Sequence, residues 1–206
     1  MTTHVATANS HAHAQGHEAE GMSRGMFGMV LFIASEIMLF GGLFAAYFYV
    51  RNQAETWPPE GIDHELSVPI AAVLTTVLIS SSIAAHIGIM ALRSNDRALF
   101  KGALAFAILL GSVFIGGQIY EWFTLMDEGL TAESGTYGST FYLITGFHGA
   151  HVIAGLCMLF VVLLRASWGD FRPQRHLFAD AAVMYWHFVD VIWVFVFTIL
   201  YVTPKL

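Results

Sequence analysis

Charged residues are scarce in this sequence. Of its 206 residues only 12% are Asp, Glu, Lys or Arg, whereas 56% are hydrophobic and the mean hydropathy is +0.63. Such a balance excludes an ordinary soluble domain. Cysteine is also nearly absent: the lone Cys157 cannot form an internal disulfide or a paired-cysteine site for copper or zinc. We therefore interpret the chain as an integral membrane protein.

The apolar residues fall into five long runs. The runs cover residues 25–50, 68–92, 98–122, 139–164 and 178–203. A helix crosses a bilayer with about 20 apolar residues, and in lipid a helix satisfies its own backbone hydrogen bonds. Polarity does not alternate along the runs, which disfavours a membrane barrel. The prediction is an all-α fold, a polytopic bundle of five transmembrane helices that occupies residues 25–206.

Residues 1–24 differ from the rest of the chain. They lack the basic start and apolar stretch of a cleaved signal peptide, and they are too polar to bury a core. We predict a disordered, histidine-rich tail. Histidine has an unperturbed pKa near 6.5, so these side chains could buffer protons; the alternative is incidental metal affinity. The tail histidines are His4, His11, His13 and His17.

The positive charges are distributed unevenly along the chain. Two of the nine, Arg51 and Lys205, flank one side of the predicted bundle. The other seven flank the tail and the second and fourth loops, which by the positive-inside rule predicts a cytoplasmic N-terminus and an external C-terminus. Within this group Arg24, Arg93 and Arg97 are candidates for contacts with anionic lipid headgroups. The seven are Arg24, Arg93, Arg97, Lys101, Arg165, Arg172 and Arg175.

Five ionisable residues lie at membrane depth, where such groups are costly and usually face a partner, a cavity or a ligand. Glu36 is the twelfth residue of the first run, roughly 17 Å from the cytoplasmic end of the helix. His148 and His151 are three residues apart in the fourth run, and His187 and Asp190 are three apart in the fifth. Each pair shares a helix face. We predict that the five form a single buried polar layer.

Three roles are open to this layer. It can be a structural network in which carboxyl groups and imidazoles lock the packing of helices. It can relay or couple protons, because a buried carboxyl and a histidine both titrate within reach of neutral pH. It can ligate a metal or a haem, although no HExxH motif occurs and a pair of histidines at a three-residue spacing is a weak metal signature.

Other features of the runs carry simpler expectations. Glu121 is placed at the outer end of the third run, as an interfacial carboxylate without a special role. His86 is expected to hydrogen-bond to a neighbouring helix. Trp186 and Trp193 are interpreted as packing residues. The short link Arg93–Arg97 predicts that the second and third helices form an antiparallel hairpin.

Several segments occur together in the order and spacing of a known family. The chain resembles subunit III of the haem-copper respiratory oxidases, which include the cytochrome c and quinol oxidases. The segments that carry the resemblance are Met29–Glu36 (MVLFIASE), Trp57–Ile62 (WPPEGI), Tyr137–Tyr142 (YGSTFY), Thr145–Val152 (TGFHGAHV) and Tyr185–Trp193 (YWHFVDVIW). They extend over most of the chain.

The resemblance implies a helical accessory subunit that has no catalytic, cofactor-binding or metal-binding residue of its own. It implies direct packing against subunit I, which carries the haems and one copper, with subunits II and IV as further partners, bound phospholipid and no nucleic acid. Family roles are support of proton uptake, lipid binding and stability of subunit I. The longer family form has seven helices, and this chain resembles the last five, which implies a bacterial inner-membrane enzyme.

The resemblance also assigns individual residues. Glu36 matches a buried carboxyl that reacts with carbodiimides in relatives. His148 and His151 match the histidines of one family segment, and His187 and Asp190 match those of another. The alternatives are a quinol oxidase subunit III, or a small transporter or an accessory protein of nitric oxide reduction built on the same fold.

Overall fold

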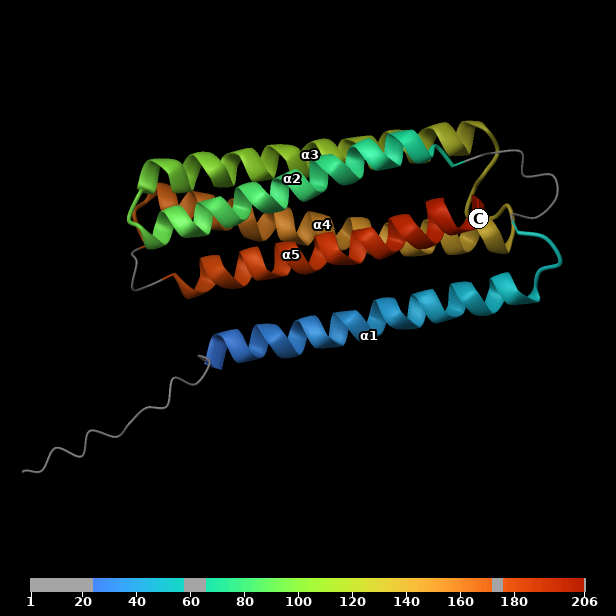
Figure 1. The fold of residues 1–206 in the computed structure, drawn as a ribbon, viewed down its shortest axis with the longest axis horizontal. Coiled ribbons are helices and arrows are strands. Elements are labelled where there is room, and N and C mark those ends of the chain that lie inside the picture. Colours follow the sequence, from blue (N-terminus) through green and yellow to red (C-terminus); the bar gives the residue numbers. More distant parts are fainter. Residues whose placement is uncertain (1–23, 58–65, 172–175, 206) are drawn as a thin grey trace, which may run out of the picture.

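The computed structural model of the protein describes residues 24–57, 66–171 and 176–205. The helices are α1 (Arg24–Gln53), α2 (Val68–Arg93), α3 (Arg97–Asp127), α4 (Thr136–Ser167) and α5 (Leu177–Phe197), and α5 continues as the π-helical turn η1 (Thr198–Val202) and the 3-10 turn η2 (Thr203–Lys205) (Figure 1). No strand occurs in these ranges. The predicted all-α fold is confirmed.

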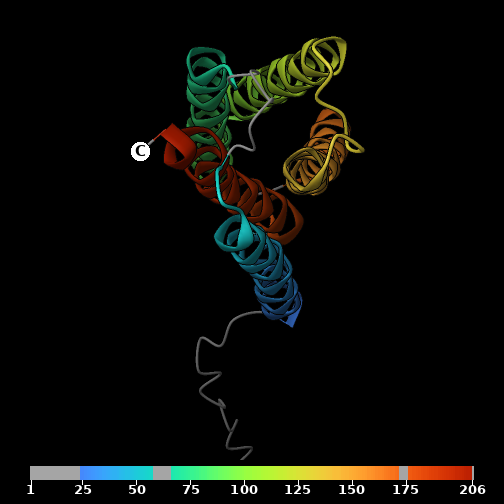
Figure 2. The same ribbon diagram turned by 90° about the vertical axis from the view of Figure 1, so that its right-hand side faces the viewer.

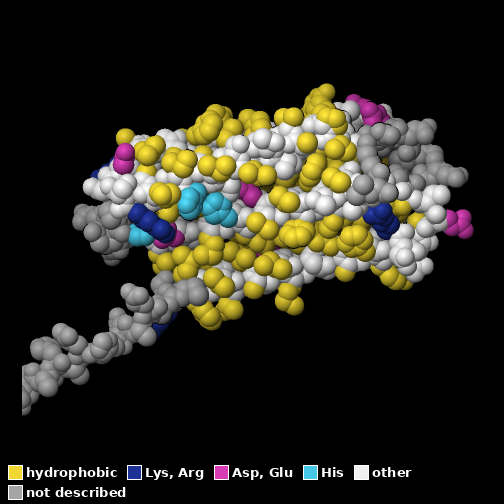
Figure 3. Space-filling view, viewed as in Figure 1, with side chains coloured by type: hydrophobic (Ala, Val, Ile, Leu, Met, Phe, Trp, Pro, Cys, Tyr) yellow, Lys and Arg dark blue, Asp and Glu magenta, His cyan; other side chains and the backbone are white. Residues whose placement is uncertain are grey.

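All five helices are long and apolar enough to cross a membrane, which confirms the five predicted spans. On the face shown in Figure 3 hydrophobic side chains cover the middle of the molecule, and most charged side chains lie near its two ends. Three helices extend beyond the predicted runs: α1 continues to Gln53, α3 continues to Asp127, and α4 covers Thr136–Ser167. Hydropathy locates only the part of a helix inside the lipid, so polar end turns escape it.

Four of the helices pack around a common centre. Contacts are most extensive between α2 and α3, and α5 contacts both α2 and α4 while α3 contacts α4. Seen end-on, α1 lies outside these four, against α5 (Figure 2). The molecule is thus a four-helix bundle, α2–α5, with a fifth helix laid along its side.

The turn between α2 and α3 closes the predicted hairpin. Asn95 adopts a left-handed backbone with φ 62°, a conformation that asparagine tolerates better than most residues. Asp96 then caps α3, because its carboxylate accepts a hydrogen bond from the Leu99 backbone N–H at 2.9 Å. The two helices run antiparallel (Figure 1), and the prediction is confirmed.

The Trp186 indole of α5 is the centre of the bundle. It is fully buried and donates a hydrogen bond from Nε1 to the Ser81 hydroxyl of α2 at 3.0 Å. Its ring reaches α3 and α4 at two glycines: a Cβ at Gly111 would lie 2.7 Å from Trp186 Cη2, and a Cβ at Gly155 would lie 2.7 Å from Cε3. Trp193 is also buried, so both tryptophans are packing residues as predicted.

Helix α1 is held differently from the other four. Phe40 and Tyr47 are its only buried residues in the described structure. Near its C-terminal end the Arg51 guanidinium donates to the Thr203 carbonyl at 3.1 Å, and the Tyr47 hydroxyl donates to the Ile199 carbonyl at 3.4 Å. A few side-chain contacts therefore replace the close packing that joins α2 to α5.

Some predicted features lie outside the described residues. These are the histidine-rich segment, the two prolines of the WPPEGI loop, Arg172 and Arg175.

The glycine beneath Trp186 provides a test of this packing. We expect Gly111→Ala to lower the free energy of unfolding by about 1–3 kcal/mol, because the new methyl group overpacks the indole. Thermal unfolding of the purified protein in detergent measures the change. Gly116→Ala, on the same helix with no atom within 4 Å of its added Cβ, is the matched control. Equal stability of the two variants would show that Trp186 does not require the glycine.

Candidate functional site

Glu36 and His151 form a pair between α1 and α4. Glu36 Oε2 lies 2.9 Å from His151 Nε2, and the two side chains are 17% and 14% exposed. The other ring nitrogen, Nδ1, lies 2.6 Å from the Phe147 carbonyl oxygen, which can only accept a hydrogen bond. A hydrogen bond to this oxygen therefore requires the proton on Nδ1.

Aromatic side chains surround this pair. The Phe40 ring meets the His151 ring edge-on at 5.1 Å between centroids. The Tyr185 hydroxyl donates to the His151 carbonyl at 3.3 Å, and the Tyr185 ring stacks on Phe32 of α1 at 6.1 Å. The ion pair or hydrogen bond thus lies in apolar surroundings, where a polar link between helices is stronger than in water.

His148 faces a different set of neighbours. Its side chain is buried among the rings of Phe40, Phe114 and Trp193, with centroid distances of 6.5, 6.0 and 4.9 Å. Neither ring nitrogen has a hydrogen-bond partner in the described part of the chain. His148 behaves as a packed aromatic ring at the junction of α1, α3, α4 and α5.

His187 and Asp190 lie on the side of α5 that meets α2. His187 Nδ1 is hydrogen-bonded to the Ser82 hydroxyl, and its ring centroid lies 5.9 Å from that of His86. Asp190 is buried and interacts with the same Ser82 side chain. Neither Asp190 carboxyl oxygen makes a hydrogen bond of regular geometry to a described residue.

The structure therefore divides the five predicted residues into three groups. Glu36 and His151 are joined, His148 is enclosed by aromatic rings, and His187 and Asp190 face α2 with Ser82. No hydrogen bond between described residues links one group to another. Sequence spacing indicates how far along its helix a residue lies, but not toward which neighbouring helix its side chain points.

Two expectations for single residues are wrong. Glu121 is not a free interfacial carboxylate without a role: its side chain is only 4% exposed and accepts two hydrogen bonds. His86 is exposed, and within the described residues neither of its ring nitrogens makes a hydrogen bond. In both cases the error comes from the orientation of the helix face, which no neighbouring residue in the sequence reveals.

Glu121 belongs to a buried cluster that the sequence analysis missed. Its Oε2 accepts hydrogen bonds from Gln118 Nε2 at 3.1 Å and from the Tyr201 hydroxyl at 2.8 Å. All three residues are buried, and Tyr201 comes from the π-helical turn η1. The cluster ties the end of α5 to α3. The three-residue spacing of Gln118 and Glu121 was the one available signal.

The predicted headgroup-contacting arginines gather at one end of the bundle. Arg24 begins α1, while Arg93 and Arg97 flank the α2–α3 turn (Figure 1). Arg93 lies 3.3 Å from Asp180 at the start of α5, and Asp180 also pairs with His176 at 3.2 Å. Arg93 remains 59% exposed, so its contact with Asp180 leaves most of the side chain open.

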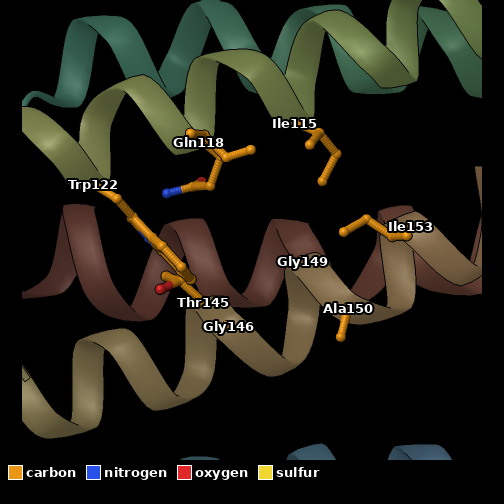
Figure 4. A pocket seen from close by; sticks show the side chains of 9 residues that line it. Ile115, Gln118, Trp122, Thr145, Gly146, Gly149, Ala150 and Ile153 are labelled. Carbon is orange, nitrogen blue, oxygen red and sulfur yellow. The ribbon is translucent and has the colours of Figure 1, made fainter.

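A groove of about 300 Å³ lies between α3 and α4. Its α3 wall includes Gln118 and Trp122, and its α4 wall includes the small residues Gly146, Gly149 and Ala150 (Figure 4). The lining is almost entirely apolar. Two buried polar atoms are exceptions, because Gln118 Oε1 and Trp122 Nε1 have no hydrogen-bond partner in the described structure.

No group of three or more His, Cys, Asp or Glu residues able to hold a metal ion occurs in the described ranges. Several of the polar residues instead make contacts between helices, as in Glu36 with His151 and Ser82 with His187.

Comparison with known proteins identifies the family. The family model described as cytochrome c oxidase subunit III matches residues 2–204. A cytochrome c oxidase subunit 3 of Thermostichus vulcanus is 40% identical over 193 residues, which are 93% of this chain and 94% of the relative. The protein of the same name from Corynebacterium diphtheriae is 44% identical over 177 residues, 84% of this chain and 85% of the relative. A third, from a Synechocystis strain, is 41% identical over 91% of this chain and 79% of its own length. With the five membrane-crossing helices, these matches show that the chain belongs to the cytochrome c oxidase subunit III family.

Proposed function

We propose that this chain is an accessory subunit of a bacterial, oxygen-reducing cytochrome c oxidase and that it carries no catalytic centre. The observation that carries the proposal is the family match over residues 2–204. In this proposal the chain packs directly against subunit I, which holds the haems and one copper, with subunits II and IV nearby. The relatives cited above all bear the name of the cytochrome c branch, which favours it over a quinol oxidase and over nitric oxide reduction.

Co-purification tests this proposal. We expect an affinity-tagged chain to bring down a haem-containing partner, visible as a Soret absorption band, together with a copper-binding subunit II. Recovery of the chain in its native membrane extract without any haem protein contradicts the oxidase assignment. Recovery with a haem protein that lacks a copper-binding subunit II indicates the quinol-oxidising branch instead.

We propose an orientation with the N-terminus in the cytoplasm, in the bacterial inner membrane. Its support is the gathering of Arg24, Arg93 and Arg97 at one end of the bundle, because positive residues concentrate on the cytoplasmic side. In this orientation Arg24 and Arg97, both exposed, lie where anionic headgroups are. We then expect a protease added to sealed spheroplasts to leave the N-terminal segment intact. Cleavage of this segment would show that the N-terminus lies outside and would contradict the proposed orientation.

We propose that the Glu36–His151 pair has a structural role. The pair joins the loosely packed α1 to α4 at 2.9 Å, in apolar surroundings. The contact gives each group a polar partner, and ionisable groups within membrane spans usually occur in such pairs. The role in stabilising subunit I then follows from holding α1 in place.

Replacement of the carboxyl group tests this role. We expect Glu36→Gln to weaken the α1–α4 contact by about 0.5–1.5 kcal/mol, the range for interhelical hydrogen bonds in membranes. The assembled enzyme then retains oxygen reduction but loses activity sooner during turnover, as an oxygen electrode measures. Ser35→Ala is the matched control, because Ser35 is exposed and bonds only its own helix. Complete loss of activity in correctly assembled enzyme contradicts a structural role.

We propose that the α3–α4 groove binds a phospholipid acyl chain. An extended chain fits a narrow apolar groove of about 300 Å³, whereas a helix about 10 Å across does not. Trp122 lines this groove, and tryptophan commonly lies at the membrane interface, where the acyl chains meet the headgroups. The glycines of α4 leave room for close contact.

Filling the groove tests lipid binding. We expect Gly149→Leu to remove one tightly bound phospholipid per complex, because its side chain occupies the space of the acyl chain. Lipid extraction or native mass spectrometry of the purified enzyme measures the loss. Gly116→Leu is the control, because Gly116 is exposed, does not line the groove and, like Gly149, has no contact within 4 Å of an added Cβ. The same lipid content in both variants removes the groove as a binding site.

We propose that the histidine-rich segment supports proton uptake. In the proposed orientation His4, His11, His13 and His17 lie on the cytoplasmic side, and histidine buffers protons near neutral pH. Deleting residues 2–20 then lowers turnover above neutral pH, where free protons are scarce. Oxygen consumption measured against pH shows the effect; an unchanged profile leaves the segment with incidental metal affinity at most.

A further inference from the structure

A polar patch interrupts the hydrophobic surface formed by α2 and α5. Figure 3 shows histidine side chains in the midst of hydrophobic ones on the side where these two helices face the viewer in Figure 1. The patch is part of what we call the α2–α5 face. The α2–α5 face consists of Ile79, Ile83, His86 and Met90 of α2 and His187 and Val191 of α5, and the two histidines form its polar patch.

The histidines of this face lie at hydrocarbon depth. His86 precedes Arg93, the last residue of α2, by seven residues, which is about 10 Å along the helix. His187 follows Leu177 by ten residues, about 15 Å. An α2 of 26 residues is about 38 Å long, against about 30 Å of hydrocarbon. Histidine has a single methylene linker, so it cannot extend to the headgroups as lysine and arginine do.

The hydrogen-bonding capacity of these imidazoles is not used up within the chain. Ser82 occupies Nδ1 of His187. His187 Nε2 and both nitrogens of His86 make no hydrogen bond in the described structure, and His86 is exposed. Two adjacent neutral imidazoles present both a donor and an acceptor. Leaving them unsatisfied in hydrocarbon costs several kcal/mol, since lipid tails offer neither.

The rest of the face is shaped for a helix. Ile79, Ile83, His86 and Met90 follow a 4-3-4 spacing, so they form one stripe along α2, and each of the three apolar side chains is 43–58% exposed. A stripe of exposed side chains at this spacing, beside a second helix, is the kind of surface against which another transmembrane helix packs. The exposed surface of α3 differs, because its middle presents Phe106, Leu109 and Val113, which lipid tails can solvate.

We propose that the α2–α5 face binds a transmembrane helix of another oxidase subunit, and that this helix presents a carboxyl, amide or hydroxyl side chain to His86 and His187. The inference rests on the proposed function, since it requires assembly into an oxidase. The partner group completes the hydrogen bonding that α2 and α5 leave open. The aliphatic side chains around the histidines exclude lipid and water from the contact.

Site-specific crosslinking in the assembled enzyme locates the occupant. A photoreactive phenylalanine replaces Ile83 on the face, and Leu109 of α3 serves as control, since it is as exposed, at 58%, and lies at a similar depth. We expect the probe at 83 to attach to a membrane segment of another oxidase subunit, identified by mass spectrometry, and the probe at 109 to attach to lipid. Attachment of the probe at 83 to lipid alone, or to a second copy of this chain, overturns the proposal.

Substitution of His86 tests the hydrogen bond itself. Leucine suits a lipid-facing site better than histidine, so a lipid-exposed position would tolerate or favour His86→Leu. A partner-facing position predicts the opposite: we expect the variant subunit to dissociate about threefold to tenfold faster during detergent washing, while His86→Asn, which keeps a donor and an acceptor, stays bound. Thermal unfolding of the chain is unchanged in both, because His86 makes no hydrogen bond within the described chain. Equal or slower dissociation of the leucine variant overturns the proposal.

These outcomes are distinguishable from failure of the proposed function. A tagged wild-type chain that recovers no haem protein removes the oxidase assignment, and the proposed face with it. A tagged chain that recovers the haem protein while the probe at 83 attaches only to lipid leaves the function intact and removes the face.

Discussion

The burial of the Trp186 indole is the contact on which the bundle depends. In one side chain α5 meets α2 through the Ser81 hydroxyl, α3 through Gly111 and α4 through Gly155. Lipid tails are as apolar as leucine, so helices in a membrane gain little from hiding apolar surface and associate through close packing and hydrogen bonds. A large ring that lies over two glycines and donates one hydrogen bond supplies both, and it fixes the positions of four helices together.

Helix α1 lacks such a contact, which explains why its polar residues matter. Glu36 joins it to α4, and Arg51 and Tyr47 join it to the C-terminal turn. The C-terminal turn is itself held against α3, because the Tyr201 hydroxyl donates a hydrogen bond to the buried Glu121. These polar residues therefore act where packing is less close. They hold α1 and the end of α5 against a bundle that the tryptophan and the glycines have already formed.

The sequence predicted the number of spans and the α2–α3 hairpin, because hydropathy and the length of the connecting segment determine these. It did not predict direction. Glu121 was expected to have no special role and is buried with two hydrogen bonds, and His86 was expected to bond a neighbouring helix and faces outward. A helix hydrophobic on all sides carries no amphipathic stripe to indicate its inner face, so side-chain direction emerges only from tertiary packing.

Three histidines within the membrane spans show how the direction of a side chain determines its contacts. His151 is satisfied inside the chain by Glu36 and the Phe147 carbonyl, and His148 is enclosed by aromatic rings. His86 also lies in an apolar stretch of sequence, but it is exposed, and neither of its ring nitrogens makes a hydrogen bond to a described residue. All three residues are histidines within membrane spans, so neither the residue type nor the position in a span distinguishes their roles. In a subunit that works within a complex, an unsatisfied group at the lipid-level surface indicates where the chain is incomplete without its partner.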